Sequence, residues 1–181
     1  MINLNRNRHW DKTHLQWLLS NNNEINLLEL AIGGGDGLAY LINQAKLFNK
    51  NKKTINIYAT DIAINMLKVT YNRFKTTEGV SINYGKPEEE PNEPIRIYLY
   101  EADNENLPFS DNVFDIVLAS LSLHIVSSPE KMLKETSRVL KSGCYSSFSV
   151  WGRQEKSAIF TLVKNSMIKF GLPTGNSRSY F

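Results

Sequence analysis

The sequence lacks several features that would assign it to a special class of protein. It has a single cysteine, so it can form no internal disulfide and is not typical of an oxidised, secreted scaffold. No apolar run approaches the length of about 20 residues that a membrane-spanning helix needs. The 21 basic and 18 acidic residues are scattered, without the basic stripe that follows a nucleic-acid backbone. We therefore expect neither a membrane span nor a nucleic-acid partner.

The composition that remains is typical of one globular domain. With 181 residues, of which 41% are hydrophobic, the chain is long enough to bury a stable core without disulfides or metal ions. We predict a single domain over 1–181, with an N-terminal helix within 1–25, a core over 26–152, and a C-terminal helix and tail over 153–181. The basic N-terminus has no apolar signal segment and is taken as part of the fold. This predicts a cytoplasmic protein, with mitochondria as the open alternative.

Five short β-rich runs alternate with helical patterns along the chain. The first and fourth runs are apolar almost throughout, as in strands that are buried on both faces of a parallel sheet. The helical patterns place apolar residues three and four apart. This alternation predicts an α/β fold, a doubly wound, mainly parallel Rossmann-like sheet with helices on both faces. The runs cover 26–32, 55–61, 95–100, 114–120 and 144–151, and the helical segments cover 37–48, 64–74 and 130–140.

Two further helices flank this core in the prediction. A leading helix is expected at about 11–19, and a trailing helix at 155–170 ends where a glycine and a proline follow. Segment 76–94 has three prolines and no period, so it is expected as a surface loop with a short strand at "VSINY", 80–84. Within 130–140, one buried face is expected to hold Met132, Leu133, Val139 and Leu140.

The stretch "LLELAIGGGDGLAYLI", 27–42, places three glycines between the first strand and the next helix. Gly33, Gly34 and Gly35 allow positive φ and a close ligand, and such turns lie at the carboxyl edge of a parallel sheet, where ligands bind. The dinucleotide fingerprint is incomplete, no Gly-Lys-Ser/Thr follows, and Asp36 would repel a phosphate at the helix N-terminus. The turn predicts a ligand without phosphates or, as the alternative, a tight connection that binds nothing.

Two acids follow later strands at the same predicted edge. Asp61 closes the second run, where a carboxylate can accept hydrogen bonds from both ribose hydroxyls of a nucleoside. Asp103 lies just past the third run, where it can accept from the exocyclic amine of adenine. With the glycine turn, these acids predict a pocket for a nucleoside that carries no phosphate.

Four motifs follow one another in order: "LLELAIGGGDG", "YATDIAINML", "EADNENLPFSDNVFDIVLASLSLHIV" and "PEKMLKETSRVLKSGCYSSFSVWG". Over 27–152 this order resembles the class I S-adenosylmethionine-dependent methyltransferases, in particular a methyltransferase type 11-like subgroup. That subgroup shows the patterns E-x-G-x-G-x-G, D-x-S-x-x-M-L and A-E-x-L-P-F-x-D-x-x-F-D. The resemblance implies an enzyme that uses S-adenosyl-L-methionine to methylate a small-molecule, lipid-like or protein acceptor.

The resemblance also implies a set of cofactor-binding residues. Gly33, Gly34 and Gly35 would shape the turn beneath the methionine part of the cofactor, and Glu29 would help to fix its amino group. The alternative for Glu29 is a buried carboxylate that neighbouring backbone N–H groups satisfy. The remaining implied contacts are Asp61 to the ribose hydroxyls, Ile62 on the adenine ring, Asp103 and Asn104 beside the adenine, and Ser120 facing the reacting centre.

The sequence departs from the family pattern in three places. Ala31 occupies the position of the family's first turn glycine, and Ala63 occupies the position of the serine in D-x-S. We therefore expect weakened cofactor binding. The family's last two strands form an antiparallel hairpin, and no such strand pair follows the fifth run here. We therefore expect an open sheet edge that can pair with a partner chain or a second copy. This keeps a second function open, a non-catalytic methyltransferase-like subunit of a larger assembly.

Methyl transfer by in-line displacement requires alignment of the acceptor and need not involve an acid or a base. No catalytic residue is therefore assigned from the sequence. If the acceptor atom is a carbon or a weakly acidic hydroxyl, His124 is the candidate general base. The alternative is a histidine that only packs and positions its loop. No metal site is predicted, and a nicotinamide oxidoreductase is disfavoured by the incomplete fingerprint and by Asp36.

Overall fold

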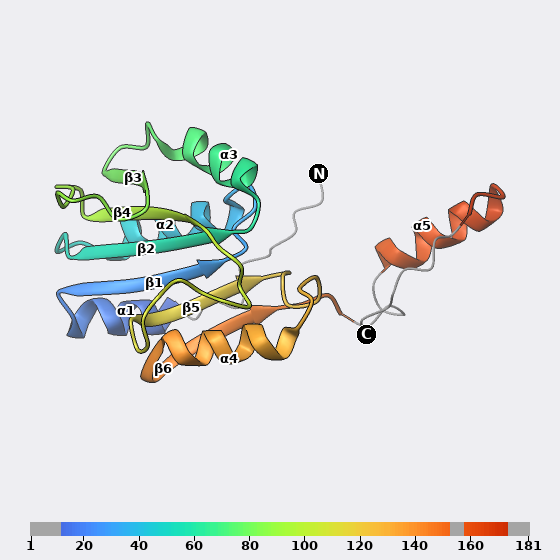
Figure 1. Cartoon of the computed structure of the whole chain (residues 1–181). Helices are drawn as coiled ribbons and strands as arrows, with labels where there is room; N and C mark the ends of the chain where they lie inside the picture. Colours follow the sequence, from blue (N-terminus) through green and yellow to red (C-terminus); the bar gives the residue numbers. More distant parts are fainter. Residues whose placement is uncertain (1–11, 153–157, 174–181) are drawn as a thin grey trace. The chain divides into compact units, whose positions relative to one another are not determined.

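The computed structural model describes residues 12–152 and 158–173 (Figure 1). The chain forms two compact units that divide after Ser149, one with the sheet and one with the last helix. The assignment of 1–181 to one domain stays a prediction. The elements are α1 (Lys12–Asn21), β1 (Glu24–Leu30), α2 (Asp36–Phe48), β2 (Thr54–Asp61), α3 (Ile64–Phe74), β3 (Val80–Tyr84), β4 (Ile95–Glu101), β5 (Phe114–Ser120), α4 (Pro129–Val139), β6 (Leu140–Ser149) and α5 (Ala158–Lys169).

Six parallel strands form one sheet in the order β3-β4-β2-β1-β5-β6 (Figure 1). Counted outward from β1, the sheet has β2, β4 and β3 on one side, and β5 and β6 on the other. This confirms the predicted doubly wound α/β fold, and the short strand predicted at 80–84 is β3. The strand order reverses between β1 and β5, and ligands bind at the carboxyl ends of strands beside such a reversal.

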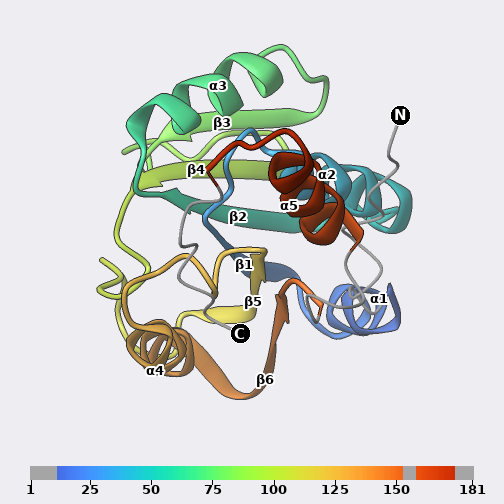
Figure 2. The same cartoon turned by 90° about the vertical axis from the view of Figure 1, so that its right-hand side faces the viewer.

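Each face of the sheet is covered by its own hydrophobic core. On one face, α1, α2 and α3 pack on strand residues that include Leu27, Ile57 and Ile97. On the other face, α4 packs on residues that include Leu28 and Val117. Figure 2 shows α1 and α2 on one side of the strands and α4 on the other. Strand β1 is therefore buried on both faces, with Ile25 and Leu27 in one core and Leu28 and Leu30 in the other.

The start of β6 is the largest difference from the predicted strand bounds. Helix α4 ends at Val139, and β6 begins at once at Leu140, four residues before the predicted run. The pairing of β5 with β6 shifts register between Phe114 and Ile116, and Gly143 has φ 78° in this irregular part. The shift interrupts the side-chain alternation by which a strand is found in a sequence.

The predicted buried face of α4 is wrong in two positions, because Leu140 begins β6 and is only half-buried, and Leu133 faces solvent. Met132 and Val139 are fully buried, but the side chain of Leu133 is 44% exposed. Thr136 completes the buried face instead, because spacings of four and three residues from Met132 reach Thr136 and then Val139.

The last helix ends as the glycine and proline signal predicts. Gly171 has φ 67° and donates its N–H to the carbonyl of Ile168 at 3.0 Å, and the Leu172 N–H donates to the carbonyl of Met167 at 2.9 Å. These bonds close the C-terminus of α5. The first predicted residues of this helix, 155–157, lie outside the described residues, as does the predicted start of the leading helix at residue 11.

Candidate functional site

The glycine turn leads from β1 directly into α2. Gly33 and Gly35 have φ of 52° and 79°, and the Gly35 N–H donates to the carbonyl of Ile32 at 2.9 Å. A Cβ on Gly33 or Gly34 would meet no atom within 4 Å, whereas one on Gly35 would lie 2.8 Å from Phe74 Cε2 of α3. Gly35 therefore allows α3 to pack closely against the turn, whereas no described side chain crowds Gly33 or Gly34.

Asp61, at the carboxyl end of β2, connects the glycine turn to the start of α3. Its Oδ2 accepts from the Gly33 N–H at 2.8 Å, and its Oδ1 accepts from the Ala63 N–H at 2.9 Å. The side chain is buried. Each carboxylate oxygen has a second lone pair, so these two bonds leave Asp61 able to accept from ribose hydroxyls as well. Sequence reasoning assigned Asp61 to the ligand and missed its bond to the turn.

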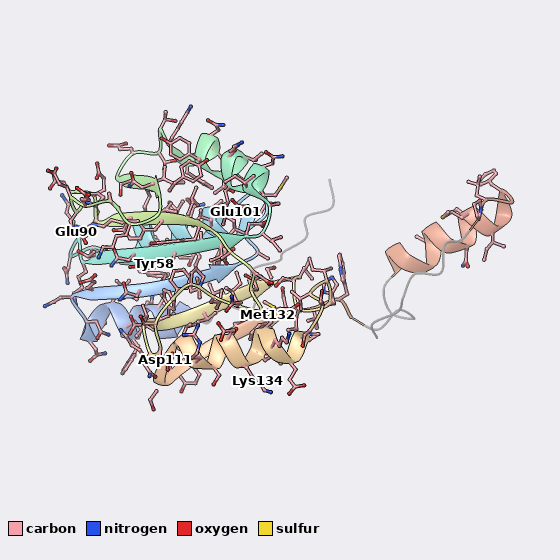
Figure 3. All side chains as sticks on the ribbon, viewed as in Figure 1. Tyr58, Glu90, Glu101, Asp111, Met132 and Lys134 are labelled. Carbon is pink, nitrogen blue, oxygen red and sulfur yellow. The ribbon has the colours of Figure 1, made fainter. Side chains whose placement is uncertain are left out.

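The predicted adenine residues lie at the same edge, past β2 and β4. Ile62 is 71% exposed, which is unusual for a large apolar side chain beside a polar site. Asp103 is exposed, and its Oδ1 accepts from the Glu105 N–H at 2.9 Å. Asn104 turns inward instead, where its Oδ1 accepts from the Thr60 hydroxyl at 3.1 Å. Figure 3 labels Glu101 at this edge and Glu90 at the opposite one.

Glu29 is a carboxyl group buried beneath the start of α2. Burial raises its pKa to about 8, and the nearby charge of Asp36 adds to the rise. Its Oε2 is buried and has no hydrogen-bond partner, so the alternative of a carboxylate that the backbone fully satisfies is wrong. Its Oε1 lies where a Cβ of Gly37 would be, 1.9 Å away. The raised pKa favours the protonated, neutral form of this carboxyl, and its buried Oε2 has no hydrogen-bond partner among the described residues.

Asp36 opens α2 and is not an isolated anion. Its Oδ1 accepts from Arg73 Nη1 of α3 at 2.8 Å, and the same nitrogen donates to the carbonyl of Gly34 at 2.7 Å. Thr70, one turn earlier on α3, donates its hydroxyl to the carbonyl of Gly33 at 3.0 Å. The predicted repulsion of phosphate by Asp36 is therefore partly offset by a cation.

The carboxyl end of β5 carries the residues predicted to face the reacting centre. The hydroxyls of Ser120 and Ser149 are 3.0 Å apart, and Leu121, with φ 54°, donates its N–H to the carbonyl of Ser149 at 2.8 Å. His124 is half-buried in the turn that follows, which the Ile125 N–H closes on the carbonyl of Ser122 at 3.0 Å. This turn precedes α4 at the same sheet edge as the glycine turn.

The predicted site residues thus gather at one edge, around the reversal in strand order. Four residues of this arrangement were not predicted, namely Gly37, Thr70, Arg73 and Ser149. Thr70 and Arg73 contact a turn that lies 37 and 39 residues earlier, and no local pattern reports such a contact. Gly37 carried a weak signal, because it extends the glycine run that opens the helix.

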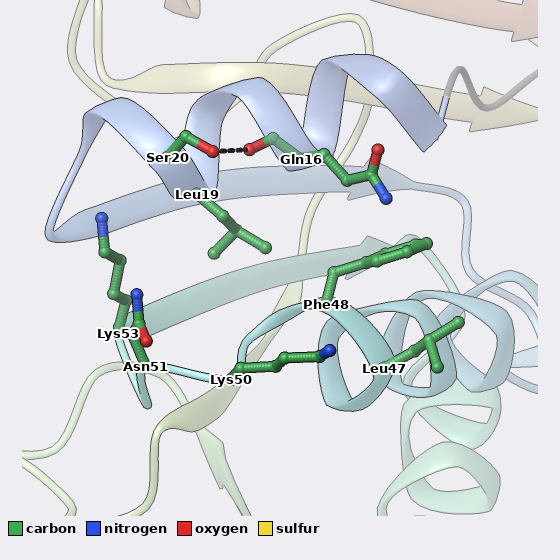
Figure 4. A pocket seen from close by; sticks show the side chains of 8 residues that line it. All are labelled: Gln16, Leu19, Ser20, Leu47, Phe48, Lys50, Asn51 and Lys53. Atoms are coloured by element: carbon green, nitrogen blue, oxygen red, sulfur yellow. Dashed lines mark hydrogen bonds between the residues drawn. The ribbon is translucent and has the colours of Figure 1, made fainter.

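A separate pocket of about 750 Å³ lies between α1, α2 and the loop before β2 (Figure 4). Lys53 directly precedes β2, so this pocket lies at the amino edge of the sheet, away from the predicted site. Its lining residues are Gln16, Leu19, Ser20, Leu47, Phe48, Lys50, Asn51 and Lys53. Over the described parts of the chain, no group of three His, Cys, Asp or Glu side chains could hold a metal ion, and no described helix could cross a membrane.

Known proteins resemble the chain over the segment that builds this edge. A family model described as a methyltransferase domain matches residues 28–148. A 2-phytyl-1,4-naphtoquinone methyltransferase of Nostoc punctiforme is 26% identical over 175 residues, 97% of this chain and 67% of that protein. A ubiquinone/menaquinone biosynthesis C-methyltransferase UbiE of Haemophilus ducreyi is 33% identical over 118 residues, 65% of this chain and 38% of that protein.

Solved structures share the fold. A SAM-dependent methyltransferase from Aquifex aeolicus superposes with a TM-score of 0.54 at 18% identity, covering 82% of this chain and 69% of that one. At this identity the likeness concerns the fold alone. The chain spans only part of the length of the two quinone-related proteins, so their whole activity does not pass to it directly.

Proposed function

The chain belongs to the family of methyltransferase domains, and from that premise we propose that it transfers a methyl group from S-adenosylmethionine to a quinone-type small molecule. S-adenosylmethionine is the cofactor of this family. Two relatives with quinone in their names support the acceptor class. The observation that carries the proposal is the open side of the glycine turn, next to an exposed Ile62 and two acids at the carboxyl edge.

The residues present fit this cofactor in three respects. A Cβ on Gly33 or Gly34 would meet no atom within 4 Å, so no side chain opposes the approach of the methionine part of the cofactor to this turn. The buried carboxyl of Glu29 has an unpartnered oxygen for an ammonium donor. Ile62 and Asp103 are both exposed at the same edge of the sheet, where an apolar side chain and a carboxylate suit the ring face and the amine of an adenine.

We assign the following roles to residues of this chain. Asp61 binds the ribose, Asp103 and Asn104 border the adenine, and the glycine turn holds the amino-acid end. When bound, S-adenosylmethionine supplies an electrophilic methyl group on a sulfonium, which is the activated part of the reaction. The protein then has to align the acceptor, and Ser120 and the turn after β5 lie where an acceptor would be aligned.

A base is needed if the acceptor atom is a ring carbon of a hydroquinone. A ring carbon that accepted the methyl group would have to lose its proton to a group of the protein or to water. We propose that His124 accepts that proton, because it is the histidine that the structure describes in the turn after β5. A His124→Gln variant with normal cofactor affinity and normal methyl transfer would remove this role.

Calorimetric titration tests the cofactor first. We expect micromolar binding of S-adenosylmethionine and of S-adenosylhomocysteine, and no binding of NADH. Methyl transfer from radiolabelled cofactor to reduced 1,4-naphthoquinone then tests the acceptor class. Binding without transfer to any quinol would favour the alternative, a non-catalytic methyltransferase-like subunit. No binding by the folded protein would overturn the proposal.

We also propose that the outer edge of β6 pairs with another strand. In the described residues this ten-residue strand pairs with β5 alone, and Tyr145 on it is 65% exposed. Unpaired strand edges of this length favour association. We expect light scattering to show an oligomer or a bound partner, and a monomer at all concentrations would contradict this. A cytoplasmic location is part of the same proposal.

A further inference from the structure

Two side chains of α3 hold consecutive carbonyls of the glycine turn. We propose that Thr70 and Arg73 are positioning residues that orient the Gly34 N–H toward the carboxylate of the cofactor's amino-acid end. This inference rests on the proposed function, because it concerns the same site. It adds two residues that the family motifs in the sequence do not contain.

The contacts follow from the spacing of the two residues on the helix. Thr70 and Arg73 are three apart, so they lie on one face of α3, one above the other. The Thr70 hydroxyl donates to the carbonyl of Gly33 at 3.0 Å, and Arg73 Nη1 donates to the carbonyl of Gly34 at 2.7 Å. The three glycines of the turn have no side chains, and these two donors are the described groups that bind the carbonyls of Gly33 and Gly34.

Peptide geometry converts these contacts into a direction for the next N–H groups. In a trans peptide the C=O and the following N–H point in opposite directions. With the Gly33 carbonyl on Thr70, the Gly34 N–H points away from α3. With the Gly34 carbonyl on Arg73, the Gly35 N–H also points away, and it donates to the carbonyl of Ile32 at 2.9 Å.

The Gly34 N–H is therefore the donor that remains. No group of the described residues accepts from it, and a Cβ added to Gly34 would meet no atom beyond its chain neighbours within 4 Å. A backbone N–H that faces open space in a glycine turn is suited to an anionic oxygen. The amino-acid end of S-adenosylmethionine carries such an oxygen as a carboxylate.

Arg73 has a second effect on the same ligand group. Asp36 lies at the start of α2, where its charge would repel a carboxylate bound to the turn. Arg73 forms an ion pair with Asp36 at 2.8 Å and so offsets that charge. Both side chains are largely exposed, so the pair adds little to stability and its main effect is on charged ligands.

The test compares two ligands that differ in the amino-acid end. S-adenosylhomocysteine carries the carboxylate, and 5′-methylthioadenosine has the same nucleoside without it. For Arg73→Gln we expect about tenfold weaker binding of the first and unchanged binding of the second. Thr70→Val should act in the same direction, and Thr70→Ser, which keeps the hydroxyl, should restore the wild-type affinity.

Lys68→Gln is the matched control, because Lys68 is an exposed cation on α3 that makes none of these contacts. If Arg73→Gln weakened the binding of both ligands equally, or of neither, the inference would be overturned and the proposed function would still stand. Failure of the wild-type protein to bind either ligand would overturn both. Arg73→Gln changes an exposed side chain, so it keeps the test decisive even if Thr70→Val does not fold.

Discussion

Glu29 and Gly37 occupy adjoining space at the start of α2, where a Cβ on Gly37 would lie 1.9 Å from Glu29 Oε1. Gly37→Ala should therefore force the buried carboxyl to turn away. We expect a loss of about 1 kcal/mol in the free energy of unfolding, because the clash exceeds the gain in helix propensity.

Gly34→Ala gives the matched comparison for this prediction. A Cβ there meets no atom within 4 Å, so the stability should stay within about 0.5 kcal/mol of wild type. The new methyl group would enter the space assigned to the cofactor and weaken binding. Denaturant unfolding and calorimetry measure the two effects, and a Gly37→Ala protein with unchanged stability would show that the carboxyl moves freely.

The raised pKa of Glu29 makes the stability depend on pH. Its pKa is about 8 in the folded protein and 4.5 at its ordinary value, so between these pH values the unfolded chain releases a proton that the folded protein retains. The free energy of unfolding therefore falls as pH rises through this window. Glu29→Gln, which is neutral at every pH, should gain about 2–4 kcal/mol relative to wild type between pH 5 and pH 8.

Urea unfolding of both proteins at several pH values measures this difference. A constant gap between wild type and Glu29→Gln across the range would mean that Glu29 titrates normally. Glu89→Gln is a suitable control, because it makes the same change from a carboxyl to an amide at an exposed position.

Asp61 combines a structural and a ligand-binding role. Asp61→Ala leaves the N–H groups of Gly33 and Ala63 without their acceptors, and we expect it to lower the free energy of unfolding by about 1–3 kcal/mol. It also removes the proposed ribose contact, so we expect the affinity for S-adenosylhomocysteine to fall at least tenfold. Asp61→Asn keeps one oxygen and should be intermediate in stability. Unchanged affinity in a folded Asp61→Ala protein would remove Asp61 from the cofactor site.

Ala31 has the left-handed φ of 53° at the position where the resembled family has glycine. This conformation costs an L-residue about 1–2 kcal/mol, and glycine avoids that cost. Part of the gain is offset because glycine has more conformational freedom in the unfolded chain. Ala31→Gly should therefore raise the melting temperature by a few degrees and leave cofactor affinity equal or higher. A lower melting temperature would show that the alanine methyl group contributes packing that outweighs the backbone strain.

The sequence predicted the architecture because its signals are local. The apolar run of β1, the three-and-four spacing of α3 and the glycines after β1 each report their own element, and their alternation reports the sheet. The start of β6 was missed because its register shift breaks the local alternation.

The candidate site was predicted in part for the same reason. The acids at strand ends follow from strand bounds, so Asp61 and Asp103 could be placed at one edge in advance. The inward turn of Asn104 onto Thr60 and the reach of Arg73 to Gly34 depend on tertiary packing. Burial, which gives Glu29 its high pKa, likewise appears only once α2 covers the strand.

The bonds of Asp61 have a consequence for how fast the site can respond to a ligand. Gly33 and Ala63 belong to connecting segments, yet their amide protons are held by a buried carboxylate and should exchange slowly with solvent deuterium. The neighbouring Gly34 amide has no such bond and should exchange fast until a ligand covers it. A turn that is already rigid loses little conformational freedom when a ligand binds, so ordering of this loop should add little to the entropic cost of binding.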